Sequence, residues 1–226
     1  LSQEIYTGTG DLVMRTMDFT IDETWIFIHK ILPSLSEIPF HEQLDLFRSY
    51  VITFSLIDSF LHTWKAWGTF EKYSMCSIAL CVDLENPESW LRPSEGGCNR
   101  QSLIDSNMLY VRDQMSLMVP SLKNAQLTDG EAHALFGLML CETDKENASD
   151  RLLALLESIR TEILVDLQRY YREEMRLNAY SARLGNLLTI CHNVRECSAL
   201  FQSIFRMQVA LFDTWSAEAQ LKQLLL

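Results

Sequence analysis

Residue types that often take part in catalysis occur in this sequence, but their spacing matches no common catalytic pattern. The five histidines stand singly, and none belongs to an HExxH pair. The sequence also has no GxSxG motif and no glycine-rich loop after a predicted strand. A single histidine on a helix is more often a packed or surface residue than a catalytic one. We therefore predict that the chain is not an enzyme.

The cysteines do not suggest a metal site. They show no CxxC pair, which a structural zinc site usually contains. The six cysteines lie mostly in apolar segments, at Cys76, Cys81, Cys98, Cys141, Cys191 and Cys197. In a chain of this length the pattern favours reduced, buried thiols in a nuclear or cytosolic protein over the disulfide framework of a small secreted one. We predict no metal ligands and no cofactor.

Charge and hydropathy exclude two further classes of partner. The formal net charge of −11 opposes direct contact with a phosphate backbone, which requires clustered Lys and Arg. The longest apolar run, YVITFSLIDSFLHTW, is shorter than the ~20 residues of a membrane span and includes Asp58 and His62. We read it as a buried core helix and expect no direct contact with nucleic acid or membrane.

The periodicity of apolar residues predicts a chain built almost entirely of helices. A first helix is expected over 19–32, begun by a capping box of Thr20 with Glu23 and limited by Pro33. A second, apolar nearly all round, follows Pro39 and should lie in the middle of the domain. Further helices are expected over 102–120, 126–142, 150–175 and 181–215, with a closing segment at 216–226. A capping box of Thr128 with Glu131 should begin the helix over 126–142, and Ser149 can cap the helix over 150–175. A short strand or hairpin is expected within 73–83, and no linker divides the chain.

The last long helix raises a choice that composition leaves open. Phe201, Phe205 and Met207 could line a cavity for an apolar ligand, because flexible methionines and flat aromatic rings fill irregular spaces well. The alternative is an ordinary packed core, and composition alone favours it.

The stretch HKILPSLSEIPFHEQLDLFR, residues 29–48, resembles the signature of the nuclear receptor ligand-binding domain. The residues that fall on this signature are Lys30, Leu32, Pro33, Ile38, Pro39, Gln43, Leu46 and Arg48, with Glu42 where Asp is usual. Two later stretches, QLTDGEAHALFGLMLCETD and ARLGNLLTICHNVRECSALFQSIF, resemble further parts of the family in the expected order. The resemblance covers residues 18–226. It leaves 1–17 as an N-terminal segment in which the family's first helix is absent or truncated.

The resemblance implies a fold class and a function. The implied fold is all-α, a three-layer antiparallel helical sandwich with one small β-hairpin. The implied function is that of the ligand-binding and coregulator-recruiting regulatory domain of a transcription factor in the nucleus. The zinc-containing DNA-binding domain of the family is expected outside this sequence. The alternative is a ligand-independent helical dimerisation or protein-interaction module on the same fold, with a filled core.

The resemblance also implies a lipophilic small-molecule ligand between the helices. The residues expected to bound its pocket are Ile21, Trp25, Ser59, His62, Met108, Val111, Met115, Phe201, Ile204 and Phe205. His62 occupies the position where family members that bind acids have an arginine. Because neutral imidazole anchors a carboxylate less well than a guanidinium does, a neutral or sterol-like ligand, or none, is expected rather than a fatty acid.

A groove for LxxLL-type coregulator peptides is implied at the end of the first helix. Lys30 should cap the C-terminal carbonyls of a bound peptide helix. The other residues assigned to this groove are Ile26, Gln43, Leu44, Arg48, Glu218 and Lys222. The last two lie in the segment 216–226, where Lys222 stands near the position of the family's acidic clamp. This segment also contains LKQLL, so it is either an activation helix or an autoinhibitory tail.

A dimer face is implied on the first half of the last long helix. Its expected residues are Arg183, Leu187, Leu188, Cys191, Val194 and Arg195, an apolar stripe with arginines at its rim. The implied partner is a second copy of the chain or another nuclear receptor.

Overall fold

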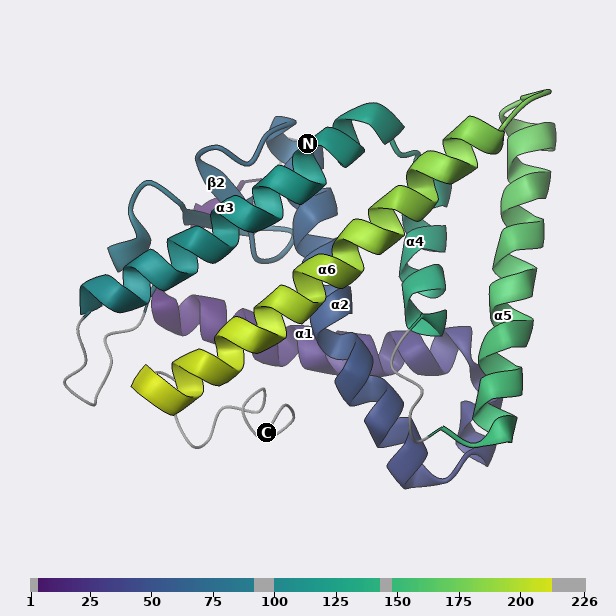
Figure 1. Ribbon diagram of the computed structural model, residues 1–226, viewed down its shortest axis with the longest axis horizontal. Coiled ribbons are helices and arrows are strands. Elements are labelled where there is room, and N and C mark those ends of the chain that lie inside the picture. The colour runs from purple at the N-terminus through teal and green to yellow at the C-terminus, as the bar shows by residue number, and fades with distance from the viewer. Residues whose placement is uncertain (1–3, 92–99, 143–147, 213–226) are drawn as a thin grey trace.

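The computed structural model describes residues 4–91, 100–142 and 148–212 as a layered bundle of helices with a small sheet (Figure 1). The long helices are α1 (Gly10–Ile31), α2 (Phe40–Trp67), α3 (Arg100–Ala125), α4 (Asp129–Cys141), α5 (Asp150–Arg169) and α6 (Ser181–Phe212). Short 3-10 helices lie at Pro33–Glu37 and Pro87–Ser89, and a π-helical turn at Tyr170–Glu174 continues α5. The sheet consists of β1 (Tyr6–Thr7), β2 (Tyr73–Met75) and β3 (Leu80–Asp83).

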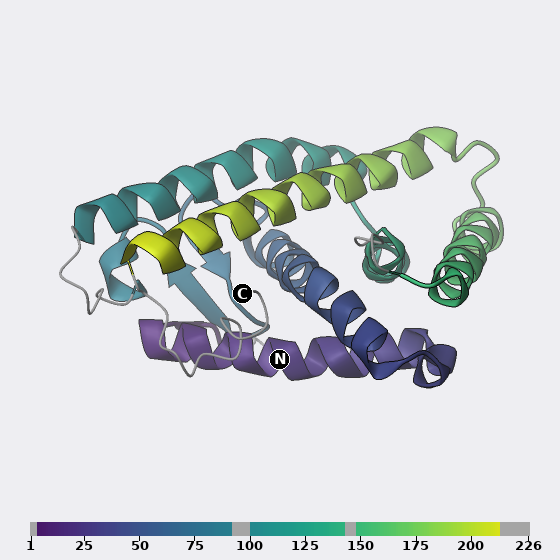
Figure 2. The ribbon, with the colours of Figure 1, turned by 60° about the horizontal axis from the view of Figure 1, so that its bottom comes forward.

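The helices are arranged in three layers (Figure 2). Helices α3 and α6 lie side by side in one outer layer, and α1 forms the opposite one. Between them lie α2, α4 and α5, together with the sheet. Helix α2 is buried on nearly all sides, as predicted, because its apolar residues face both outer layers. The predicted all-helical sandwich is confirmed.

The proline-bracketed stretch connects an outer layer to the middle one. Pro33 ends α1 and begins a 3-10 helix, and Leu32, Leu35 and Ile38 are buried along this turn. The Gln43 side-chain amide donates a hydrogen bond of 2.7 Å to the Ile38 carbonyl oxygen. This bond holds the turn against the start of α2.

Helix α1 begins ten residues before the expected start at Thr20. The Thr20 hydroxyl does not cap a helix but donates to the Thr16 carbonyl oxygen at 3.0 Å, within the helix. The predicted start was therefore wrong, and α1 runs through the expected boundary at residue 17. Packing explains the earlier start, because Met17 packs against the hydrophobic core and this contact stabilises the additional helical turns.

The predicted hairpin is present, and it carries an additional strand. Strands β2 and β3 pair antiparallel, with Met75 opposite Cys81, while β1 pairs parallel to β3, with Tyr6 opposite Leu80. The strand order is β1-β3-β2. Strand β1 has only two residues, too few for an alternating pattern to predict a strand from the sequence.

The middle layer is fixed by caps that the sequence did predict. Thr128 and Glu131 form the capping box of α4, and the Ser149 hydroxyl accepts from the Leu152 amide to begin α5. The Ser149 amide in turn donates to the carboxylate of buried Glu42 at 3.0 Å. Hydrogen bonding by the Ser149 side chain and by its backbone amide holds the pKa of Glu42 below its ordinary value and connects the start of α2 to that of α5.

The described part of the chain shows neither a candidate membrane-spanning helix nor a candidate metal site. None of their helices has the length and apolar character needed to cross a bilayer. No group of three or more His, Cys, Asp or Glu in this part of the chain is arranged to hold a metal ion.

Candidate functional site: an internal cavity and two surfaces

An internal cavity of about 230 Å³ lies between α1, α2, the sheet, α3 and α6. The start of α1 contributes Gly10, Val13 and Met17, and α2 contributes Ser55, Leu56 and Ser59. The sheet and the turn after it contribute Ser74, Met75, Cys76, Val82, Leu84, Trp90 and Leu91. Helix α3 provides Leu103, Asn107, Tyr110, Val111 and Gln114, and α6 provides Phe201, Ile204, Phe205 and Gln208. Segments far apart in the sequence thus meet around one largely apolar space.

Half of the residues expected to bound a ligand pocket line this cavity. These are Ser59, Val111, Phe201, Ile204 and Phe205. The Ser59 hydroxyl donates to the Met75 carbonyl oxygen at 2.6 Å and so ties α2 to the sheet. Phe201 stacks on Phe205, with ring centroids 6.2 Å apart. Their role as ligand contacts remains a prediction.

The other five expected residues lie elsewhere, chiefly because α1 starts earlier than predicted. Its first two turns, not Ile21 and Trp25, reach the cavity. Ile21 belongs to the packed core, and Trp25 lies against His29 and Phe47 where α1 crosses α2. On α3, Met108 and Met115 are partly buried, but Val111 and Gln114 are the residues of that face that line the cavity.

His62 does not line the cavity but pairs with an acid on its own helix. Its Nδ1 atom lies 3.1 Å from the Asp58 carboxylate. The hydrogen bond to Asp58 raises the pKa of His62, while burial and Asp58 together raise the pKa of nearby Glu23. The comparison of His62 with a ligand-binding arginine is therefore not supported by its position, since its imidazole is committed to Asp58.

Sequence reasoning missed the polar residues of the cavity. Asn107, Tyr110 and Gln114 follow Leu103 at spacings of three and four, and Gln208 continues the stripe of Phe201, Ile204 and Phe205. Extending the apolar stripe by one turn would have found Gln208. On α3 and α6 the expected pocket residues were apolar ones only, so the polar positions of the same faces were not included.

The surface where the end of α1 meets the start of α2 combines exposed apolar side chains with a cation. We call it the clamp surface and define it by Ile26, Lys30, Leu44 and Arg48. Ile26 is 52% exposed, Lys30 is exposed in the last turn of α1, and Leu44 is partly buried. Arg48 lies 3.5 Å from Asp45. Phe40, 66% exposed beside Trp25, extends the apolar part.

Gln43 supports the clamp surface from below rather than forming its wall. It is buried, and its side-chain oxygen lies 3.3 Å from Nε2 of His29 on α1. Together with its bond to Ile38, this contact fixes the two helix ends relative to each other. Glu218 and Lys222, the remaining residues assigned to this groove, lie outside the described residues.

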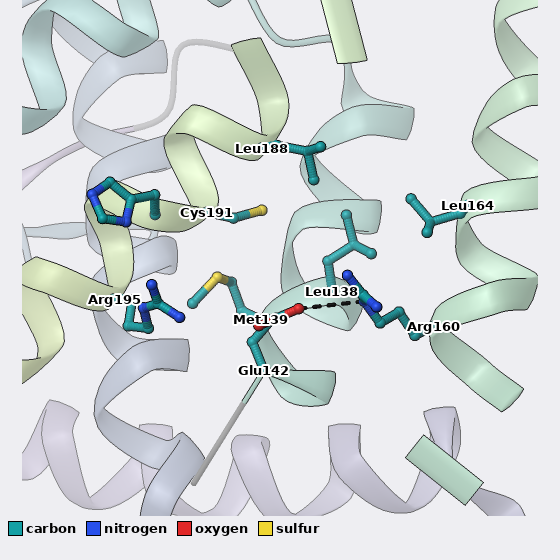
Figure 3. A pocket seen from close by; sticks show the side chains of 9 residues that line it. Leu138, Met139, Glu142, Arg160, Leu164, Leu188, Cys191 and Arg195 are labelled. Atoms are coloured by element: carbon teal, nitrogen blue, oxygen red, sulfur yellow. Dashed lines mark ion pairs between the residues drawn. The ribbon is translucent and has the colours of Figure 1, made fainter. Parts of the chain in front are cut away.

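A second surface lies where α4, α5 and α6 meet (Figure 3). A groove of about 170 Å³ is lined there by Leu138, Met139, Glu142, Arg160, Leu164, Leu188, Cys191, His192 and Arg195. Arg160 of α5 pairs with Glu142 at the end of α4 at 3.3 Å, across the groove (Figure 3). We call this the α6 groove.

The expected dimer face divides between the core and this groove. Leu187 and Val194 have no exposed surface, and Cys191 is nearly buried. Leu188 is 45% exposed, and Arg195 is exposed beside it in the α6 groove. Because α6 packs on several helices at once, most apolar side chains of this stripe are buried in the core. Leu188 and Arg195 are the expected residues that a partner could reach.

Arg183 turns inward instead of forming the rim of that face. Its guanidinium donates from Nε and Nη2 to the two carboxylate oxygens of Glu131, both at 2.6 Å. Glu131 has no exposed surface, and it also accepts from the Tyr171 hydroxyl at 2.9 Å. The start of α6 is thereby fixed to the start of α4.

No disulfide joins the five cysteines in the described part of the chain. Burial raises the pKa of Cys76, Cys191 and Cys197 to about 12. These thiols are therefore protonated near neutral pH and poorly reactive.

The layers, the small sheet and the cavity between the layers define a class, a sandwich of helices with a space between them. The chain belongs to the family of nuclear hormone receptor ligand-binding domains, since the family pattern with that description matches residues 5–207. A solved structure, the Ultraspiracle ligand binding domain from Drosophila melanogaster, has a similar fold, with a TM-score of 0.63 and 15% sequence identity. The match covers 91% of this chain and 76% of that one. The family is non-enzymatic, in agreement with the prediction from the sequence.

Proposed function

We propose that the chain is a ligand-binding and coregulator-recruiting regulatory domain of a nuclear receptor transcription factor that acts in the nucleus. The observation that carries the proposal is the internal cavity of about 230 Å³, lined by helices of all three layers and by the sheet. A ligand that binds one arrangement of these elements better than another shifts the population of that arrangement. The alternative, a ligand-independent module with a filled core, is disfavoured by the cavity.

The clamp surface is the proposed site for an LxxLL-type peptide. An amphipathic peptide helix would lay its leucines on Ile26, Leu44 and Phe40, whose exposed surfaces are apolar. Lys30 would donate to the C-terminal carbonyls of that helix, where the partial charge is negative. Because α1 both begins at the cavity and ends at Lys30, one rigid element connects the two sites.

The test is the affinity of a fluorescently labelled LxxLL peptide, measured by anisotropy. Lys30→Ala should weaken binding about tenfold, the size of one charge-assisted hydrogen bond. Lys123→Ala, which removes an exposed lysine from the last turn of α3, is the matched control and should leave the affinity unchanged. Equal affinities of the wild type and Lys30→Ala would place the peptide elsewhere.

The segment 216–226 decides how the clamp surface is regulated, and it lies outside the described residues. Its LKQLL sequence could occupy the clamp surface itself, because a tethered segment has an effective concentration on the order of millimolar. Deletion of residues 219–226 should then strengthen peptide binding. If deletion abolishes binding, the segment is an activation helix in which Glu218 supplies the acidic clamp.

A further inference from the structure

The cavity has a polar side that is entirely uncharged. Its amide and phenol groups come from Asn107, Tyr110 and Gln114 on α3 and from Gln208 on α6. Within the described residues, no Asp, Glu, Lys, Arg or His lines the cavity. Burial raises the pKa of the Tyr110 hydroxyl well above its ordinary value, so this group is also neutral. A charged ligand would therefore lose its hydration without gaining a counter-charge from these residues.

One donor on this side lacks an acceptor. Asn107 donates to the Leu103 carbonyl oxygen at 2.8 Å, and the Tyr110 hydroxyl is hydrogen-bonded to the Gln114 amide. Gln208 is only 6% exposed. Its side-chain nitrogen is buried and has no hydrogen-bond partner among the described residues. Buried donors are almost always paired in folded proteins, so this one calls for an acceptor that the described chain does not supply.

We propose that the cavity takes a compact, uncharged, apolar molecule with one acceptor oxygen, such as a ketone, and that Gln208 donates to that oxygen. This proposal rests on the ligand-binding function proposed above and adds the chemical class. The size agrees with a compact ligand, because about 230 Å³ lies below the ~300–1,000 Å³ of drug-sized sites. Phe201, Ile204 and Phe205 and the apolar residues of the sheet suit a hydrocarbon body. The lining also includes the uncharged hydroxyls of Ser55, Ser59 and Ser74.

The test uses three probes of nearly equal shape on the full chain, with dissociation constants from isothermal titration calorimetry. Acetophenone carries a carbonyl oxygen, α-methylstyrene replaces this oxygen with a methylene group, and benzoate carries a negative charge. Acetophenone should bind about tenfold more tightly than the other two, the effect of one hydrogen bond to an otherwise unpaired donor. Tightest binding by benzoate, or equal binding of acetophenone and α-methylstyrene, would overturn the proposal.

The variant Gln208→Leu tests whether Gln208 causes the tighter binding of acetophenone. This variant should bind acetophenone and α-methylstyrene equally, and it should unfold at the wild-type temperature or above, because it removes an unpaired buried donor. Gln208→Met serves the same purpose if the leucine variant does not fold. Gln202→Leu makes the same chemical change on α6 outside the cavity, and it should keep the wild-type preference. An advantage for acetophenone that survives in both Gln208 variants contradicts the proposal.

The outcomes separate this inference from the function on which it rests. If α-methylstyrene binds but acetophenone has no advantage that depends on Gln208, the ligand cavity stands and only the assigned chemistry fails. If none of the three probes binds, both the chemistry and the ligand-binding function fail. Peptide binding at the clamp surface is tested independently in either case.

Discussion

Glu131 shows how a single buried charge can organise this fold. Its carboxylate accepts hydrogen bonds from the Thr128 amide, the Tyr171 hydroxyl and the Arg183 guanidinium, which belong to three different segments. Burial alone would raise the pKa of Glu131, but the bonds from Arg183, Thr128 and Tyr171 outweigh it and hold the pKa below its ordinary value. The charged form is therefore the one that the fold stabilises.

Removing the partner of this charge should be costly. Arg183→Ala leaves the carboxylate of Glu131 buried without its cation, and the free energy of unfolding should fall by about 3–5 kcal/mol. Arg195→Ala removes an exposed arginine from the same helix and should change stability by less than about 0.5 kcal/mol. Urea denaturation followed by circular dichroism measures both. Similar losses in the two variants would mean that the Glu131–Arg183 pair is not a stabilising contact.

The same carboxylate predicts a pH dependence. Because the pKa of Glu131 is lower in the folded state than in the unfolded chain, its contribution is complete above the unfolded value of about 4.3. It is lost as the pH falls through the folded value. The stability difference between the wild type and Glu131→Gln should therefore be largest near neutral pH and shrink below about pH 4.3. A difference that grows on acidification contradicts the assigned direction of the pKa shift.

At the scale of elements, helices with strong local signals were predictable and helices shaped by packing were not. Thr128 and Ser149 begin α4 and α5 as expected, because a capping side chain acts within one turn. Helix α3, in contrast, continues past Pro120 to Ala125, where a local reading would end it. Burial of Leu122 and Ala125 offsets the hydrogen bond that the proline removes.

Helix α6 carries the predicted dimer face, of which Leu188 and Arg195 are exposed beside the α6 groove. Leu188→Arg should convert a dimer to a monomer in analytical ultracentrifugation, because it places a charge in the centre of an apolar contact. Leu109→Arg alters a comparably exposed leucine on α3 and should leave the association unchanged. A wild type that is monomeric alone and with every receptor partner tested would exclude this surface.

At the scale of the whole molecule, the sequence predicted the architecture, and half of the residues expected to bound a pocket line the cavity. The expected residues of α6 line the cavity because their register follows from apolar spacing within one helix, whereas on α3 only Val111 of the three expected residues does. The contribution of α1 was misplaced, because a capping pattern at Thr20 suggested a start that packing of Met17 overrides. The polar residues, above all Gln208, were missed because the residues expected on α3 and α6 were apolar ones only, although Gln208 lies on the continuation of the α6 stripe.

If the cavity is a regulatory site, its content should control the affinity of the clamp surface for an LxxLL peptide. Val111→Trp tests it directly, because Val111 lines the cavity from α3 and a tryptophan there fills the space without touching Lys30. Arg112→Trp, one residue further on and exposed, is the matched control. Val111→Trp should change the dissociation constant of the LxxLL peptide at least about fivefold, which is the lower range of allosteric coupling. Arg112→Trp should leave this constant unchanged. A folded Val111→Trp variant with wild-type affinity would contradict the claim and favour a ligand-independent interaction module.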